Sequence, residues 1–142
     1  MAFVHGKKSV FKIDDVSGNL IDISAYCEEV SLPRSIETAE TTTFGNDDKT
    51  YITGLRDATV SISGKFDAAS ASAVDAVLSG VLGSASTVSW AFRTSSASTS
   101  STNPEYQGEG ILTSYEITGS VGDAVTFSAE LQCSGAITRA TS

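Results

Sequence analysis

The side chains that could carry catalysis or bind a metal are few and widely separated in this chain. The single histidine, His5, lies close to the N-terminus, and nothing around it resembles the nucleophile turn of a serine hydrolase. Cys27 and Cys133 lie far apart, and with one histidine they give no zinc-binding spacing. No glycine-rich dinucleotide or triphosphate motif is present. We therefore expect no enzymatic activity, no cofactor and no bound metal.

The acidic pairs fit turns and strands better than they fit sites. Asp14-Asp15 and Asp47-Asp48 have the ligand type that calcium prefers, but the complete EF-hand spacing is missing. Glu28 and Glu29 fall in a predicted strand, where neighbouring side chains point to opposite faces, so they cannot form an acid–base pair with each other. We interpret all of these carboxylates as turn or surface residues.

Composition and charge indicate one globular domain covering residues 1–142. The chain has 40% apolar residues and a formal net charge of −8, and Lys7-Lys8 is the only adjacent basic pair. Because strong DNA binding needs clustered basic residues, we expect no specific nucleic-acid binding, although DNA could still pass an acidic wall. No apolar run approaches the ~20 residues that cross a membrane. The N-terminus lacks an apolar signal core, which favours synthesis in a cytoplasm, where free cysteines are expected and a disulfide is the alternative.

The elements that must position any site are mostly strands. Turn residues at 14–19 separate expected strands at 9–13 and 20–23, and a third strand at 26–32 would end at Pro33. From Thr59 to Asp67 the alternation is strict, with Val60, Ile62 and Phe66 on one face. Such a period of two predicts one buried face and one solvated face.

The apolar period then changes from that of a strand to that of a helix. The residues at helical spacing are Val74, Val77, Leu78, Val81 and Leu82. Asp67 or Ser72 could cap the start, with Asp75 completing a capping box, and Gly83 is a natural end. We expect this single helix to cover an open end or a flank of the sheet.

The C-terminal half again reads as strands. Val88, Trp90 and Phe92 alternate, and the Ser/Thr-rich residues 94–102 predict a solvated loop. Strands are expected at 106–112 and 114–118, with Gly108 and Gly110 compatible with a bulge. The last strand has an apolar face made of Val125, Phe127, Ala129, Leu131 and Cys133. Residues 135–142 are expected to fray or to dock on a partner. The predicted fold is mainly β, an antiparallel β-sandwich or barrel with one flanking helix.

Residues 34–54 contain too few large apolar side chains to belong to a core. The exceptions are Ile36, Phe44, Tyr51 and Ile52. A segment of this length is uncommon inside a compact domain. It is either a mobile surface loop or an extended arm, with a hairpin tip near Gly45, whose isolated apolar residues dock on a neighbouring subunit.

The segment 36–67 carries a family resemblance. Its distinctive pieces, in order, are Glu40-Thr41-Thr42-Thr43-Phe44-Gly45, Lys49-Thr50-Tyr51, Gly54-Leu55-Arg56-Asp57-Ala58 and the strand 59–67. Followed by one helix and a strand-rich C-terminal half, they resemble the major tail tube proteins of long-tailed bacteriophages. Related folds occur in contractile-tail tubes and in type VI secretion tubes.

The resemblance implies a structural virion protein that forms hexameric rings. In that family the rings stack into a tail tube around a tape measure protein, end at tail-terminator and tail-tip proteins, and give a negatively charged conduit for DNA ejection. Synthesis and assembly would take place in the cytoplasm of the bacterial host, and no membrane would be involved. The alternatives are a surface β-sandwich that binds a glycan or a protein, and a type VI secretion-like tube.

The resemblance also assigns expected roles to particular residues. The lumen-lining candidates are Ser61, Ser63, Lys65, Thr126, Ser128 and Glu130. Lys65 would pair with a neighbour such as Glu130 or face elsewhere. The arm, 34–54, would contact the next ring or an adjacent subunit, and the candidates for this contact are Phe44, Tyr51, Ile52 and Arg56. The loop 94–102 would face the outside of the tube.

Overall fold

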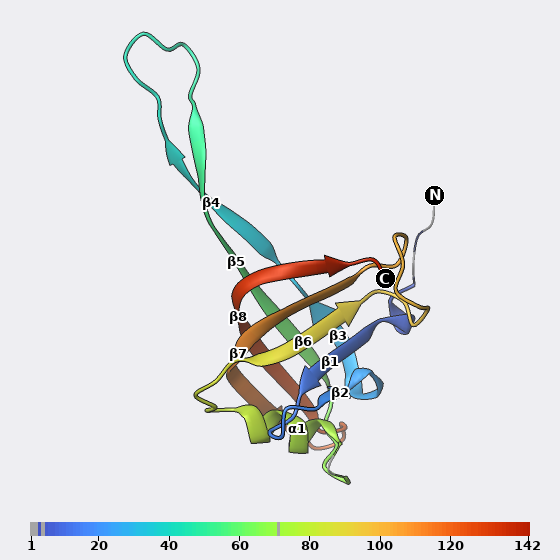
Figure 1. Cartoon of the computed structure of the whole chain (residues 1–142). Helices are drawn as coiled ribbons and strands as arrows, with labels where there is room; N and C mark the ends of the chain where they lie inside the picture. The colour runs from blue at the N-terminus through green and yellow to red at the C-terminus, as the bar shows by residue number, and fades with distance from the viewer. Residues whose placement is uncertain (1–2, 4, 71) are drawn as a thin grey trace.

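The computed structural model describes residues 3, 5–70 and 72–142, and it is mainly β with one α-helix (Figure 1). Two short 3-10 turns, η1 (Gly6–Lys8) and η2 (Ser24–Tyr26), precede β1 and β3. The strands are β1 (Val10–Asp14), β2 (Leu20–Asp22), β3 (Cys27–Ser31), β4 (Arg34–Glu40), β5 (Tyr51–Lys65), β6 (Val88–Arg93), β7 (Glu105–Thr118) and β8 (Thr126–Ala140). The helix is α1 (Val74–Val81).

The strands form one antiparallel sheet in the order β2-β1-β6-β7-β8-β5-β3, and β4 pairs with β5 outside this path. The sheet bends around its own apolar face without closing. Figure 1 shows α1 across the lower end of the body, while the β4–β5 hairpin projects from the upper end. The predicted fold class, mainly β and antiparallel with one flanking helix, is confirmed.

Side-chain alternation builds the core as predicted. Val60 and Ile62 of β5 face inward, in register with Leu131 and Ala129 of β8. Trp90 is the largest fully buried side chain. The prediction was wrong for Val125, which precedes β8 and is 41% exposed. Val125 belongs to the exposed β7–β8 loop and not to β8, so the alternation that buries Phe127 does not extend to it.

The helix buries the predicted stripe, but it begins differently from the prediction. Val74, Val77, Leu78 and Val81 are buried, whereas Leu82 is the exposed C-cap residue. The N-cap is Ala73, which is fully buried and offers no side-chain hydrogen bond. The Ser72 hydroxyl lies against that of Ser70, and Asp67 accepts from the Asp75 backbone N–H only through its carbonyl. Packing of the chain into the core at this point therefore overrides capping by a polar side chain.

Strands β7 and β8 are longer than the sequence predicts. β7 is continuous, with register shifts after Gln107 and after Leu112. Residues 138–140 pair with 105–107, so the expectation of a fraying C-terminal segment was wrong. Gly135, with φ +85°, lies where the register between β8 and β7 shifts, and the two strands pair again beyond it.

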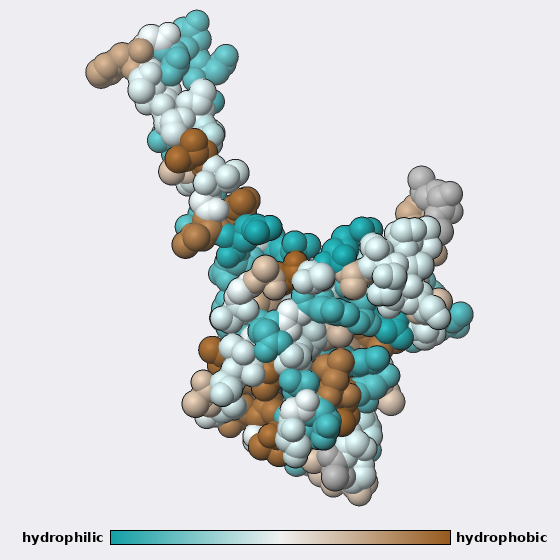
Figure 2. Space-filling model, viewed as in Figure 1, coloured by the Kyte–Doolittle hydropathy of each residue, from teal (hydrophilic) through white to brown (hydrophobic). Residues whose placement is uncertain are grey.

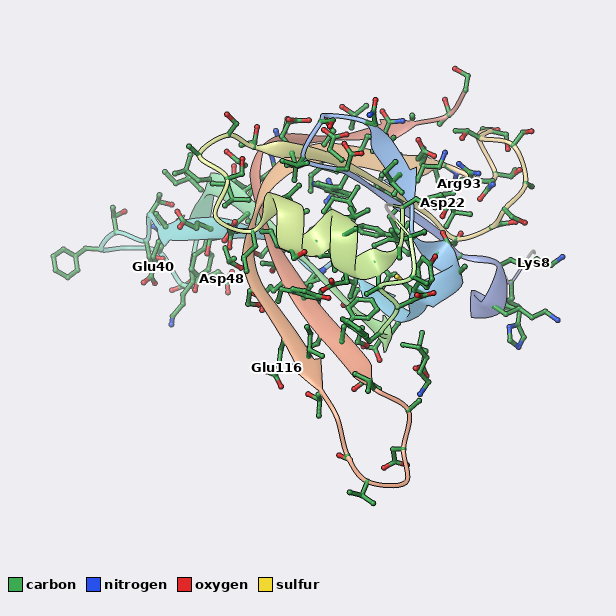
Figure 3. The ribbon with its side chains drawn as sticks, turned by 90° about the horizontal axis from the view of Figure 1, so that it is seen from below. Lys8, Asp22, Glu40, Asp48, Arg93 and Glu116 are labelled. Carbon is green, nitrogen blue, oxygen red and sulfur yellow. The ribbon has the colours of Figure 1, made fainter. Side chains whose placement is uncertain are left out.

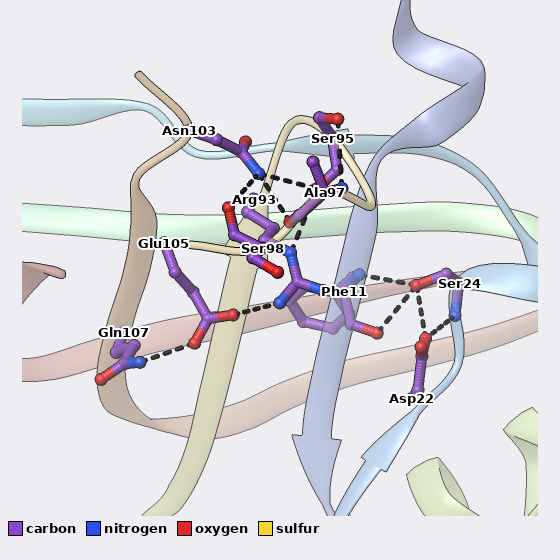
Figure 4. Close-up of polar contacts among 10 residues, drawn as sticks. All are labelled: Phe11, Asp22, Ser24, Arg93, Ser95, Ala97, Ser98, Asn103, Glu105 and Gln107. Carbon is purple, nitrogen blue, oxygen red and sulfur yellow. Dashed lines mark hydrogen bonds and ion pairs between the residues drawn. The ribbon is translucent and has the colours of Figure 1, made fainter. Parts of the chain in front are cut away.

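Asn103, which follows the Ser/Thr-rich loop after β6, anchors that loop through its side chain. The Asn103 amide donates hydrogen bonds to the carbonyls of Ser95 and Ala97, at 3.3 and 2.8 Å (Figure 4). At the base of the loop, Arg93 pairs with Glu105 at 2.6 Å. The loop is solvated, as predicted, but it is anchored at several points.

Candidate functional site

The six predicted lumen residues lie side by side on the outer face of β5 and β8. Ser61 is opposite Glu130, Ser63 opposite Ser128, and Lys65 opposite Thr126. The ladder continues onto β7 on one side and onto β3 on the other. We call this surface the polar face: Glu28, Glu29 and Ser31 of β3, Ser61, Ser63 and Lys65 of β5, Ser114, Glu116 and Thr118 of β7, and Thr126, Ser128 and Glu130 of β8. The prediction that Glu28 and Glu29 point to opposite faces was wrong, because the register shift between Cys27 and Glu29 interrupts the alternation of β3.

The polar face is acidic and carries short hydroxyl side chains. It carries four carboxylates and only one lysine, Lys65. The carboxylates are those of Glu28, Glu29, Glu116 and Glu130. A hollow of about 290 Å³ opens between Glu29 and Glu130, because the residues between them are mainly serines. Hydroxyls and carboxylates present no positive charge to a phosphate, so such a surface does not retain DNA.

Lys65 is the only basic residue of the polar face, and its charge is compensated. Its Nζ lies 3.1 Å from Oε1 of Glu28, with both side chains a little more than half exposed. Lys65 therefore pairs with a neighbouring carboxylate, which was one of the two expectations, but the partner is Glu28 and not Glu130. Glu130 is opposite Ser61, four residues along the strand from Lys65, which corresponds to about 13 Å. An exposed ion pair of this kind adds little stability, but it neutralises the one cation on the polar face.

Two unpaired strand edges border the polar face. β6 pairs with β7 only as far as Gly110, so residues 111–118 of β7 have one free edge in the described structure. β3 pairs only with β5 and leaves its other edge free over the described residues. Free edges are templates for pairing with another chain. These edges could not be predicted from the sequence, because strand adjacency depends on the tertiary fold.

The arm is a two-stranded hairpin made of β4 and residues 51–58 of β5. Glu40 pairs with Tyr51 and Ala39 with Ile52. Beyond the strands, Thr41 donates its backbone N–H to the Thr50 carbonyl at 2.8 Å, and the hydroxyls of these two threonines also lie 2.8 Å apart. Strand pairing therefore orders the arm up to this point, and Gly45 turns with φ +93° at the tip. The predicted contact residues Phe44, Tyr51 and Ile52 are exposed along it.

A few contacts fix the base of the arm on the body. The Gln132 amide donates to Oδ1 of Asp57 at 2.8 Å and to the Ala58 carbonyl at 3.1 Å. The Arg34 guanidinium carbon lies 5.8 Å from the centre of the Tyr106 ring, within cation–π range. Beside these contacts runs a groove of about 700 Å³ between the arm and the C-terminal part of β8, and the predicted contact residue Arg56 lines it.

The cysteines are free and partly buried, so the disulfide alternative does not apply. Burial raises the pKa of Cys27 to about 12, with a further contribution from the nearby Asp22 charge. Burial also raises the pKa of Cys133. At neutral pH both groups are therefore thiols, the weakly nucleophilic form.

The described residues contain no cluster of three or more His, Cys, Asp or Glu side chains placed to hold a metal ion. Within the same residues, no helix has the length and hydrophobicity needed to cross a membrane.

The fold is similar to that of several solved tube assemblies. The chain aligns with a subunit from the tail of an empty gene transfer agent particle, refined with C6 helical symmetry, at TM-score 0.79 and 18% identity over 96% of this chain and 98% of that one. The SPP1 tail tube protein gives TM-score 0.78 and 11% identity over 99% and 80%. A sheath–tube complex of the extracellular contractile injection system PVC gives 0.67 and 11% over 99% and 93%. At these identities the likeness shows the fold alone.

Sequence comparison shows the family. No curated protein sequence matches this chain. A family profile described as phage tail tube protein matches residues 3–139, nearly the whole length. This match disfavours the alternative of a surface module that binds glycans or proteins. The chain belongs to the phage tail tube protein family.

Proposed function

We propose that six copies of this chain form a ring, that rings stack into the tube of a phage tail, and that DNA leaves through the bore. The observation that carries this function is the polar face with a free strand edge on each side. Family membership and the fold shared with tail tubes support it. The role is structural rather than enzymatic.

The two free edges supply the ring interface. The edge of β3 on one copy and residues 111–118 of β7 on the next are different surfaces, so their contact is heterologous and can close into a ring. Backbone pairing between them would join the polar faces of neighbouring copies into one continuous sheet. That sheet is the wall of the bore in this proposal.

The polar face then lines the bore. Ser61, Ser63, Thr126 and Ser128 supply hydroxyls, Glu130 supplies negative charge, and Lys65 is neutralised by Glu28. The conduit is therefore net negative, and passing DNA finds no unpaired cation on the polar face to hold it. In the assembled particle we also expect contacts with a tape measure protein inside the tube and with tail-terminator and tail-tip proteins at its ends.

The arm supplies contacts between rings or between neighbouring subunits. Phe44 at its tip is fully exposed and touches no core residue. Aromatic side chains concentrate binding energy at protein interfaces.

The chain would be made in the host cytoplasm and would act in the virion tail.

Electron microscopy of the purified, concentrated chain tests the proposal. Negative staining should show rings or hollow tubes with six-fold symmetry. A sample that stays monomeric at high concentration, as judged by size-exclusion chromatography, would contradict it.

The variant Phe44→Ala tests the role of the arm. We expect a folded monomer with an unchanged melting temperature, but short tubes or none, because the substitution removes only an exposed tip residue. Deletion of residues 94–102 is the matched control, since a loop on the outside of the tube should be dispensable. Tubes of normal length from Phe44→Ala would remove the arm from the assembly contacts.

A further inference from the structure

The arm presents two faces, and the register of its strands assigns each residue to one of them. Opposite partners in an antiparallel pair lie on the same face, and residues along one strand alternate between faces. The register shift between Ile36 and Thr38 leaves β4 regular, because the extra residue lies on β5 between Thr53 and Arg56. Ile36 therefore lies on one face of the arm, and Ala39 lies on the other.

Apolar side chains occur on both faces. Tyr51 is opposite Glu40, which places it on the face of Ile36. Ile52 is opposite Ala39, which places it on the reverse face. Ile36, Tyr51 and Ile52 are 47%, 55% and 59% exposed. Figure 2 shows hydrophobic residues along the lower part of the arm.

A ribbon that rests on a single surface needs only one apolar face, with polar residues on the other. The arm does not have this pattern, and it makes no packing contact with its own body beyond its base, since every residue of β4 is exposed. We propose that in the assembled tube the arm lies between two other copies of this chain, one covering each face. This inference rests on the proposed function and extends it.

The groove at the base of the arm indicates how the first of these copies approaches. It opens beside Ile36 and continues past Leu55 to Ala136 and Ile137. Arg34 and Arg56 add positive charge to this apolar lining. A copy seated in the groove therefore covers the Ile36 face, and it should offer apolar and acidic residues.

The β7–β8 loop, residues 119–125, has that chemistry. Val121 is fully exposed, and Asp123 adds negative charge. Figure 3 shows the loop projecting beyond the body, past Glu116. The loop lies next to the end of β5, because Phe66 donates its backbone N–H to the Val125 carbonyl at 2.9 Å. The arm contains the other end of this strand, where β5 begins. Head-to-tail stacking therefore brings the loop of one copy toward the arm of another, as an open heterologous interface requires.

A matched pair of substitutions tests whether both faces are used. Ile36→Ser and Ile52→Ser change the same residue type at similar exposure on opposite faces. Each should raise the protein concentration needed for half-maximal tube formation by about fivefold or more, because each removes an apolar interface contact. The melting temperature of the monomer should stay unchanged. If only one of the two variants weakens assembly, the arm has one partner surface and the proposal is wrong.

Photocrosslinking tests whether two different copies are involved. A benzophenone amino acid is placed at Ile36, at Ile52, or at both positions of the same chain, and the labelled chain is assembled with a large excess of unlabelled chain. Denaturing gels should show a two-chain product for each single label and a three-chain product for the double label. The Ile36 label should attach to a peptide containing residues 119–125.

The outcomes separate this inference from the proposed function. If the wild-type chain forms no tubes, the proposed function fails. If tubes form but the doubly labelled chain gives only two-chain products, the tube stands and the sandwiched arm is overturned. Attachment of the Ile36 label to another segment would remove the β7–β8 loop as the partner surface.

Discussion

Gly64 lies where β5 passes so close to β3 that no side chain fits. A Cβ atom at this position would be 1.9 Å from the Tyr26 carbonyl oxygen and 2.8 Å from Cα of Cys27. Both neighbours are backbone atoms, so neither can rotate away. We expect Gly64→Ala to lower the free energy of unfolding by about 3 kcal/mol or more, measured by urea denaturation.

Gly80 provides the matched control for that substitution. It lies inside α1 on the exposed side, and a Cβ there would meet only the Val16 side chain, at an ordinary contact distance of 3.4 Å. Because glycine is a poor helix former, Gly80→Ala should raise the free energy of unfolding by up to about 1 kcal/mol. Equal effects of the two substitutions would refute the assigned close approach at Gly64.

Because folding raises the pKa of the Cys27 thiol, we expect the folded protein to lose stability at alkaline pH. The pKa of the thiol rises from 9.0 to about 12 on folding. Between these values the unfolded chain has lost this proton and the folded chain retains it, so raising the pH favours unfolding. The contribution is fully present below about pH 9 and is lost as the pH rises toward 12. Cys27→Ala should show a shallower alkaline decline in urea denaturation; an identical decline would contradict the assignment.

At the scale of elements, α1 is tied to the sheet by one polar contact as well as by its apolar stripe. The Tyr115 hydroxyl of β7 donates to Oδ1 of Asp75 in the first turn of the helix, at 2.9 Å. This contact helps to hold the helix over the open end of the core. Burial, followed by the bond to Asp75 and its charge, raises the pKa of Tyr115, so the phenol keeps the proton that it donates.

Removing that contact should loosen the helix without unfolding the sheet. Tyr115→Phe should cost about 1 kcal/mol of unfolding free energy, because it deletes one partly buried hydrogen bond. Asp75→Ala also removes a favourable charge from the helix N-terminus, so the double variant is needed to isolate the pair. A double-mutant cycle should give a coupling energy of about 1 kcal/mol, whereas strictly additive effects would show that the bond contributes nothing.

At the scale of the whole molecule, the sign of charge on the polar face determines what a tube of this chain can carry. Glu29, Glu116 and Glu130 lie on three different strands of that face. Changing all three to Lys should make the bore basic and lead tubes to retain short DNA duplexes. Retention should disappear between about 50 and 200 mM salt, because DNA binding through phosphates releases counterions.

A control and a nuclease make that experiment specific. Glu29→Gln, Glu116→Gln and Glu130→Gln together should give tubes that retain no DNA, since they add no cation. DNA held by the lysine variant should resist a nuclease too large to enter the bore. Retained DNA that the nuclease digests would place the polar face on the outside of the tube.

Much of the architecture could be predicted from local patterns. Val60, Ile62, Phe127 and Leu131 alternate with polar residues, which is enough to assign both strands and their buried faces. The predictions failed where a distant part of the chain decided the outcome. Ala73 replaced the expected polar helix cap because the core buries it, and pairing with β7 extended β8 to Ala140 through residues that have no apolar alternation.

The candidate site divides in the same way. The sequence by itself determined that β5 and β8 each have a hydroxyl-rich face, that 34–54 cannot belong to a core, and that the chain resembles tail tube proteins, because alternation and composition are local properties. Only the tertiary structure decided that Lys65 pairs with Glu28, that free edges border the polar face, and that Ile36 and Ile52 lie on opposite sides of the arm. These depend on strand order and register, which are fixed by packing between residues far apart in the chain.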